Sequence, residues 1–135
     1  MQPRQPCGVL VVDDDMALRD ALRLLLEDAG HVVDEAPDGA VALDMLQLAE
    51  HPLVVLLDFM MPGMSGLELL HEVTHDDDLC NGHHFILVTA NSALLPAGLL
   101  GLLTIHAIPV VAKPFDLDTL LATVAHACDE IRARR

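Results

Sequence analysis

The strongest constraint on the fold is a series of short apolar runs that each end abruptly in a polar residue. Such runs, rich in β-branched residues, indicate strands that are buried on both faces, as in a parallel sheet. The polar residues that end the first, third, fourth and fifth runs are Asp13 and Asp14, Asp58, Thr89 and Lys113. Because the carboxyl ends of parallel strands share one edge, we expect these side chains to meet there.

Segments with helical periodicity separate the apolar runs. Leu18, Leu22 and Leu25 recur on one helical face, and Gly30 follows as a stop signal. The expected strands are Val9–Val12, His31–Ala36, Leu53–Leu57, Phe85–Val88 and Ile108–Ala112. The expected helices run from about Leu18 to Ala29, Gly39 to Ala49, Ser65 to Thr74, Ser92 to Leu103 and Asp116 to Ile131. The alternation predicts an α/β fold, a doubly wound five-stranded parallel sheet with five helices.

Charge limits the kinds of partner. The chain has 21 acidic and 7 basic residues and a formal net charge of −14, which repels nucleic-acid phosphates and anionic lipid headgroups. The long uncharged stretch between Asp78 and Lys113 is broken by glycine, proline and asparagine, so it lacks the roughly 20 consecutive apolar residues of a membrane span. We therefore expect no direct contact with nucleic acid or membrane.

The cysteines and the N-terminus indicate the compartment. Cys7, Cys80 and Cys128 are odd in number and form no C-x-x-C pair, which favours reduced thiols in a cytoplasm over a disulfide framework. The first residues contain no apolar stretch typical of a signal peptide. We expect a cytoplasmic protein whose residues 1–135 form one domain, with a core from about residue 8 to about residue 131.

The expected cluster of polar residues has a defined chemistry. Several carboxylates at one edge repel each other unless a cation joins them, and oxygen ligands with open positions suit Mg²⁺. The ammonium group of Lys113 can neutralise a phosphoryl oxygen, and the Thr89 hydroxyl can donate a hydrogen bond to another. This edge therefore has the groups needed to hold a phosphorylated carboxylate.

Four motifs closely resemble the receiver domains of two-component response regulators. They are Val9–Asp15, Asp58 with Met61–Gly66, Val88–Ala90 and Lys113–Phe115. Four motifs in order, each at the end of an expected strand, form a specific signal, and the resemblance covers about residues 9–131. It implies a flavodoxin-like receiver fold with strand order 2-1-3-4-5 and Mg²⁺-dependent transfer of a phosphoryl group from a kinase phosphohistidine.

The resemblance also implies roles for individual residues. Asp58 would be the phosphoacceptor, and Thr89 and Lys113 would contact the phosphoryl group. In the family the peptide bond between the lysine and Pro114 is usually cis. Where many receivers carry Tyr or Phe, three residues before the lysine, this chain has Val110.

The metal ligands follow from the same resemblance. Asp14, Asp58 and the backbone carbonyl of Met60 would bind Mg²⁺ directly, and Asp13 would assist, commonly through water. The chain would then be a signalling switch that catalyses its own phosphorylation and dephosphorylation, not a metabolic enzyme. Its phosphoryl donor would be a sensor histidine kinase or a phosphotransfer protein.

The output surface is expected in the last third of the chain. Between Ser92 and Ile105 there are more leucines than one core-facing stripe requires, so some should reach the surface and bind a downstream protein or a second copy of the chain. The predicted surface is the fourth helix, fifth strand and fifth helix. The alternative is that Pro96, Gly98 and Gly101 let the segment fold irregularly and bury most leucines.

Three other interpretations fit parts of the sequence. His71–His75 matches the zinc motif H-E-x-x-H but falls on the third expected helix, away from the carboxyl edge. A phosphatase of the haloacid-dehalogenase type needs a second acidic residue where Met60 stands, and a pseudo-receiver would lack part of the acidic and lysine set that this chain keeps. His83 and His84 with Cys80 and Asp76–Asp78 could give that region adventitious metal affinity, but a solvated acidic loop is the expected structure there.

Overall fold

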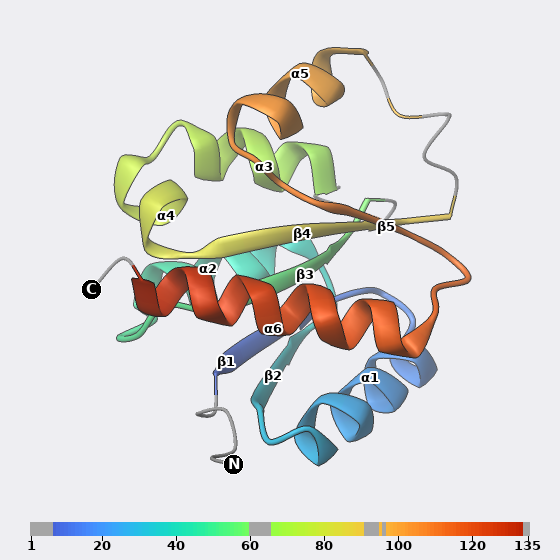
Figure 1. The fold of residues 1–135 in the computed structure, drawn as a ribbon. Coiled ribbons are helices and arrows are strands. Elements are labelled where there is room, and N and C mark those ends of the chain that lie inside the picture. The colour runs from blue at the N-terminus through green and yellow to red at the C-terminus, as the bar shows by residue number, and fades with distance from the viewer. Residues whose placement is uncertain (1–6, 60–65, 91–94, 96, 134–135) are drawn as a thin grey trace.

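A parallel sheet forms the centre of the chain in its computed structural model, which describes residues 7–59, 66–90, 95 and 97–133 (Figure 1). The strands are β1 (Gly8–Val12), β2 (Val32–Ala36), β3 (Val54–Asp58), β4 (His84–Thr89) and β5 (Val110–Ala112). Their order is β2-β1-β3-β4-β5, and every neighbouring pair is parallel. The predicted five-stranded sheet and its strand order are confirmed.

Six helices occur among the described residues, one more than predicted. They are α1 (Met16–Asp28), α2 (Gly39–Leu48), α3 (Gly66–Thr74), α4 (Asp77–Gly82), α5 (Ala97–Ile105) and α6 (Leu117–Ala133). In the part of the chain that is described, none of them is long and apolar enough to cross a bilayer.

The additional helix is α4, and it corrects the expectation of a solvated acidic loop. Asp76 caps it, because its Oδ1 atom accepts hydrogen bonds from the backbone N–H groups of Asp78 at 3.0 Å and Leu79 at 3.2 Å. Leu79 is buried in the same hydrophobic cluster as the buried residues of α3. The acidic run therefore begins a helix that one apolar side chain anchors.

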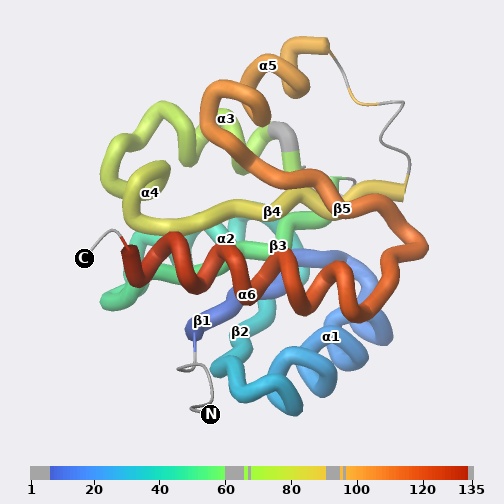
Figure 2. Tube along the Cα trace, viewed as in Figure 1, coloured from blue at the N-terminus to red at the C-terminus, as the bar shows by residue number. Residues whose placement is uncertain are grey.

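Helices cover the sheet on both faces (Figures 1 and 2), and a separate hydrophobic cluster lies on each face. Side chains alternate along a strand, so Val9 and Val11 of β1 pack towards α1 and α6, whereas Leu10 and Val12 pack towards α2, α3, α4 and α5. This arrangement explains why the three central strands, β1, β3 and β4, are almost entirely apolar up to their last residues. The polar residues are left at the strand ends.

Several predicted helix ends are confirmed by capping contacts. Asp15 accepts a hydrogen bond from Leu18 N at 3.2 Å at the start of α1, and Asp116 accepts one from Thr119 N at 3.3 Å at the start of α6. Gly30 follows α1 with a φ of +97°, a conformation that favours glycine. Ser65, expected to begin the third helix, lies outside the described residues.

The segment after β4 is where the predicted boundaries differ most. The helix expected from Ser92 to Leu103 is observed as α5 from Ala97, and residues 91–94 and 96 lie outside the described part. Leu99 and Leu103 of α5 are buried, whereas Leu100 and Ile105 are exposed. The expectation that some apolar residues of this segment reach the surface is therefore confirmed, and α5 is a regular helix that buries Leu99 and Leu103.

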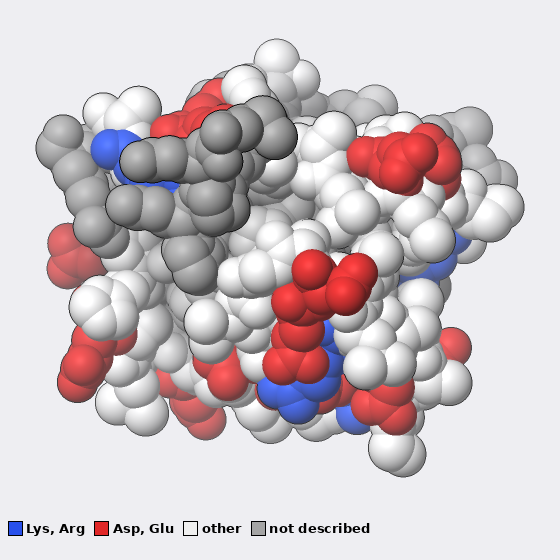
Figure 3. Space-filling model, turned by 60° about the horizontal axis from the view of Figure 1, so that its bottom comes forward, with Lys and Arg blue, Asp and Glu red and all other residues white. Residues whose placement is uncertain are grey.

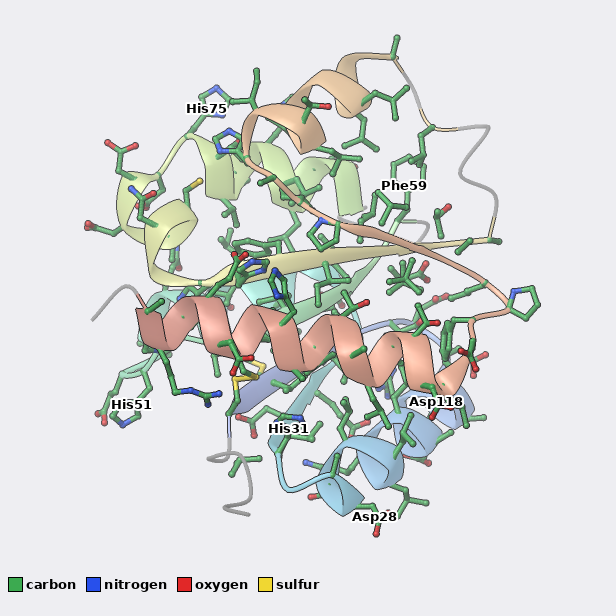
Figure 4. All side chains as sticks on the ribbon, in the orientation of Figure 1. Asp28, His31, His51, Phe59, His75 and Asp118 are labelled. Atoms are coloured by element: carbon green, nitrogen blue, oxygen red, sulfur yellow. A yellow bond between two sulfur atoms is a disulfide. The ribbon has the colours of Figure 1, made fainter. Side chains whose placement is uncertain are left out.

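The expectation of three reduced cysteines is wrong. Cys7 and Cys128 form a disulfide, visible under α6 in Figure 4, while Cys80 remains a thiol. The two bonded residues are 121 positions apart in sequence, and their Cα atoms lie 5.9 Å apart. Cys7 directly precedes β1, and α6 packs on the face of the sheet where Cys7 lies. Sequence spacing could not reveal a pairing that depends on how the last helix crosses the sheet.

Acidic side chains dominate the charged surface. On the face shown in Figure 3 they form several separate groups, and the basic side chains occupy only small areas. This distribution agrees with the formal net charge of −14.

Candidate functional site

The predicted site residues lie at the carboxyl edge of the sheet. Asp58 ends β3 and Thr89 ends β4, whereas Asp13 and Lys113 directly follow β1 and β5. Backbone hydrogen bonds continue the ladder to this edge, from Phe59 N to the Val88 carbonyl at 3.0 Å and from Lys113 N to the Thr89 carbonyl at 2.7 Å. The register of the sheet thus brings together residues from four strands.

Three carboxylates converge at this edge. Asp13, Asp14 and Asp58 each offer an oxygen atom, and these atoms all lie within 4.8 Å of one another. Asp13 and Asp58 are buried, whereas Asp14 is exposed. Within the described ranges this is the only such group of three potential ligands. An oxygen-only set that is open on one side suits Mg²⁺.

Met60 cannot be placed in this cluster. It was expected to contribute its backbone carbonyl to the metal, and it lies outside the described residues. The fit to a divalent cation therefore rests on the three carboxylates.

Lys113 brings the balancing positive charge. Its Nζ atom lies 3.3 Å from Oδ2 of Asp13 and 3.6 Å from Oδ1 of Asp58. One ammonium group cannot neutralise three carboxylates, so the site retains an electrostatic demand for a further cation. The peptide bond from Lys113 to Pro114 is cis, as the family resemblance implied.

Thr89 lies between β3, which ends at Asp58, and Lys113. Its side chain is buried at the end of β4, next to β3 on one side and β5 on the other. Its carbonyl accepts the hydrogen bond from the backbone of Lys113. The residue that ends β4 and the residue that follows β5 are therefore joined directly through their backbones.

Arg19 supports the site and was not foreseen from the sequence. Its Nη1 atom donates to the backbone carbonyl of Asp13 at 2.6 Å, and its Nε atom lies 3.3 Å from Oε1 of Glu35. Asp13 is held further because its Oδ1 atom accepts from the N–H of Asp15 at 2.9 Å. An arginine on the first helix belongs to no local motif, so only the tertiary contact identifies it.

Gly66 permits the close approach of α3 to the backbone of Asp58 and Phe59. A Cβ atom at this position would lie 2.7 Å from the carbonyl oxygen of Asp58 and 2.9 Å from the Cα atom of Phe59. The N–H of Gly66 also donates to the Phe59 carbonyl at 3.1 Å. Gly66, the last residue of the Met61–Gly66 motif, is therefore a glycine for a steric reason, because a Cβ atom there would clash with the backbone of Asp58 and Phe59.

The H-E-x-x-H motif forms no comparable site. His71 and His75 have ring centroids 6.2 Å apart, and Nδ1 of His75 lies 2.6 Å from the backbone carbonyl of His71. Figure 4 shows His75 at the end of α3, far from the carboxyl edge. No third ligand joins them within the described ranges.

The neighbouring histidines also point to different partners. Nδ1 of His83 accepts a hydrogen bond from Leu53 N at 3.0 Å, and Nε2 of His84 lies 3.0 Å from Oε2 of Glu130. They do not converge with α4, so the adventitious metal site considered above is not assembled.

Sequence relatives agree with the geometry. Residues 9–125 match the response regulator receiver domain family. The response regulator MprA of Mycolicibacterium vanbaalenii is 38% identical over 120 residues, which are 87% of this chain and 48% of that protein. MprA of Mycobacterium avium is 38% identical over 117 residues, 84% of this chain and 47% of that protein. The chain thus spans about half the length of these relatives.

Solved structures agree as well. A CheY-like receiver domain protein from Methanospirillum hungatei superposes with a TM-score of 0.82 at 32% identity, over 93% of this chain and 97% of that one. TrrA of Thermotoga maritima, solved in complex with Mg²⁺ and beryllofluoride, gives a TM-score of 0.74 at 32% identity, over 90% and 98%. With its sheet order and its acidic cluster beside a lysine, the chain belongs to the family of response regulator receiver domains of two-component signalling.

Proposed function

We propose that Asp58 accepts a phosphoryl group from the phosphohistidine of a sensor histidine kinase or phosphotransfer protein, in a reaction that depends on Mg²⁺. The observation that carries the proposal is the position of Asp58 beside a second buried carboxylate, Asp13, with the ammonium group of Lys113 in contact with both. A buried carboxylate in such surroundings is held in one place and kept reactive towards phosphorus.

The transfer forms one bond and breaks one bond. A carboxylate oxygen of Asp58 attacks phosphorus while the bond from phosphorus to the donor imidazole nitrogen breaks. The imidazole keeps the electron pair of that bond, and Asp58 becomes an acyl phosphate. A bound Mg²⁺ supplies positive charge to the phosphoryl oxygens, and Asp13 and Asp14 are the side chains that would hold it with Asp58.

Lys113 and Thr89 complete the phosphoryl site. Lys113 exchanges its contact with Asp58 for a phosphoryl oxygen, and Thr89 donates its hydroxyl hydrogen to another. Because the two residues share a backbone hydrogen bond, the fifth strand and its flanking loops respond to phosphorylation. The chain then acts as a cytoplasmic switch whose residues 1–135 are one domain.

Output passes through the surface made by α5, β5 and α6. This surface carries the exposed apolar side chains Leu100, Ile105, Val110 and Leu117. Leu117 is exposed at the first position of α6. An apolar surface of this kind suits a downstream protein or a second copy of the chain, and phosphorylation changes its affinity.

The test is chemical. The chain is incubated with acetyl phosphate and Mg²⁺, and an acid-stable, base-labile acyl phosphate is located by peptide mass. Asp58→Asn should abolish the modification, since the amide has nearly the same shape but is a far poorer nucleophile. The control is Asp28→Asn at the exposed end of α1 (Figure 4), which should label like the unchanged chain. Undiminished labelling of Asp58→Asn at the same peptide contradicts the proposal.

A further inference from the structure

A cavity lies at the opposite edge of the sheet from Asp58, where β1 and β2 begin. It has a volume of about 400 Å³, and its walls include Cys7, Val32, Asp34, Pro52, Cys128 and Arg132. Both sulfur-bearing residues of the disulfide therefore line the same hollow as a carboxylate and a guanidinium group. This site takes no part in the phosphoryl chemistry proposed above.

The two sulfur-bearing residues are unequally accessible. Cys7 is half-buried, whereas Cys128 is only 2% exposed on the inner face of α6. A thiolate must approach along the line of the disulfide bond to attack it, so access decides which sulfur reacts. The attacked atom is then Sγ of Cys7, and the leaving atom is Sγ of Cys128.

We propose that this cavity is a thiol-exchange site, at which a low-molecular-weight thiol opens the Cys7–Cys128 disulfide and its oxidised form closes it again. A thiolate attacks Sγ of Cys7, the bond to Cys128 breaks, and its electron pair leaves with Sγ of Cys128, which takes up a proton. A second thiolate attacks the added sulfur of this mixed disulfide and releases the Cys7 thiolate and the oxidised small molecule. The two thiols supply both electrons.

The walls of the cavity indicate the class of thiol. Arg132 offers a positive charge and Asp34 a negative one, beside the apolar Val32 and Pro52. Such a lining suits a thiol that carries both a carboxylate and an ammonium group, such as glutathione. A purely anionic thiol meets the repulsion of a chain with net charge −14.

Opening the disulfide breaks the covalent link between α6 and Cys7, the residue before β1, but it leaves the packing of α6 on the sheet in place. Val124, Ala127 and Ile131 of α6 remain buried against the sheet, so the reduced chain keeps its fold. The Cys7 carbonyl also keeps its hydrogen bond from Val32 N at 3.1 Å. The exchange is thus a reversible covalent change in a folded protein.

The first experiment traps the mixed disulfide. In a Cys80→Ser background, Cys128→Ser and Cys7→Ser chains are treated with oxidised glutathione, and the adducts are followed by intact mass. The adduct on Cys7 should form about tenfold faster than the adduct on Cys128, a difference of about 1.4 kcal/mol in activation free energy. Equal rates, or no adduct on Cys7, overturn the proposed direction of attack.

The second experiment tests the cavity with all native cysteines in place. Val32→Phe adds bulk to the cavity wall. The matched control is Leu24→Phe, because Leu24 is also an exposed apolar residue but lies on α1, outside the cavity. Reduction of the disulfide by glutathione should slow about tenfold in Val32→Phe only, and should be equal in both chains after unfolding in guanidinium. Reduction that occurs only after unfolding, or slows equally in both variants, overturns the proposal. Both readouts are independent of phosphorylation of Asp58.

Discussion

Lys113 and Asp13 form an ion pair of 3.3 Å between residues that are one hundred positions apart in the sequence. Lys113 is the only lysine in the chain, and its other carboxylate neighbour is Asp58. The ammonium group therefore lies against two of the three carboxylates that are the candidate metal ligands.

Replacing this lysine should separate phosphorylation from signalling. Lys113→Ala is expected to bind Mg²⁺ roughly three- to tenfold more tightly, because a competing cation is removed. It should still accept some phosphoryl group from acetyl phosphate but should lose the change in partner binding. Lys113→Arg, which keeps the charge, is the control for Mg²⁺ affinity, measured by titration. Equal partner binding by phosphorylated wild type and Lys113→Ala would argue against the role of the lysine.

Magnesium should stabilise the unphosphorylated chain. Binding relieves repulsion among Asp13, Asp14 and Asp58, and at ten times its Kd it adds about 1.4 kcal/mol to the free energy of unfolding. Thermal melts in EDTA and in millimolar Mg²⁺ measure the effect. Asp14→Asn should reduce the difference between the two melts, whereas Asp20→Asn, exposed on α1, should leave it unchanged. Identical melts and labelling rates in EDTA and Mg²⁺ would rule out the metal role.

Two glycines should respond to alanine in opposite directions. Gly66→Ala places a methyl group against the backbone of Asp58 and Phe59, so it should lower the free energy of unfolding by about 1–3 kcal/mol and slow labelling. Gly101→Ala on α5 meets no neighbouring atom within 4 Å and should raise stability by about 0.5–1 kcal/mol. Urea unfolding compares the two, and an unaffected labelling rate in Gly66→Ala would show that the close contact is not needed.

Buried His83 should make the fold sensitive to mild acid. Burial lowers the pKa of His83 below its ordinary value of 6.5, against a backbone hydrogen bond at Leu46 that raises it. The unfolded chain therefore binds this proton more readily, and stability should fall as the pH drops below about 6.5, by at most about 1.4 kcal/mol per pH unit for one proton. His83→Gln should flatten the dependence in unfolding curves taken between neutral and mildly acidic pH. A slope unchanged by that substitution would assign the effect to other groups.

The output surface should change on activation. Beryllofluoride with Mg²⁺ is expected to alter amide hydrogen exchange in residues 97–131 and to change the sedimentation of the chain. Ile105→Ser should abolish binding of the downstream protein or of a second copy of the chain, because Ile105 is 78% exposed at the end of α5. It should leave labelling of Asp58 intact. Leu24→Ser, a similarly exposed apolar residue on α1, is the control. Changes confined to α1 and α2 would refute this choice of surface.

The sequence by itself determined which segments become strands and which residues end them. Val9–Val12 and Phe85–Val88 are apolar because both of their faces are covered, and the polar residue after each run marks where the cover stops. In a parallel sheet that pattern is enough to place Asp13, Asp58 and Thr89 at one edge. The start of the last helix at Asp116 could equally be predicted from the sequence, because the capping residue and its partner are only three residues apart.

Only the tertiary structure decided the contacts that join distant parts of the chain. The carbonyl of Asp13 is held by Arg19, and Cys7 is bonded to Cys128, because α1 and α6 cross the same face of the sheet at particular positions. Periodicity predicts that a helix has a buried side, but the neighbours that it meets depend on how helices and strands pack together. For the same reason, Leu99 is buried and Leu100 is exposed, although the two residues are adjacent and chemically identical.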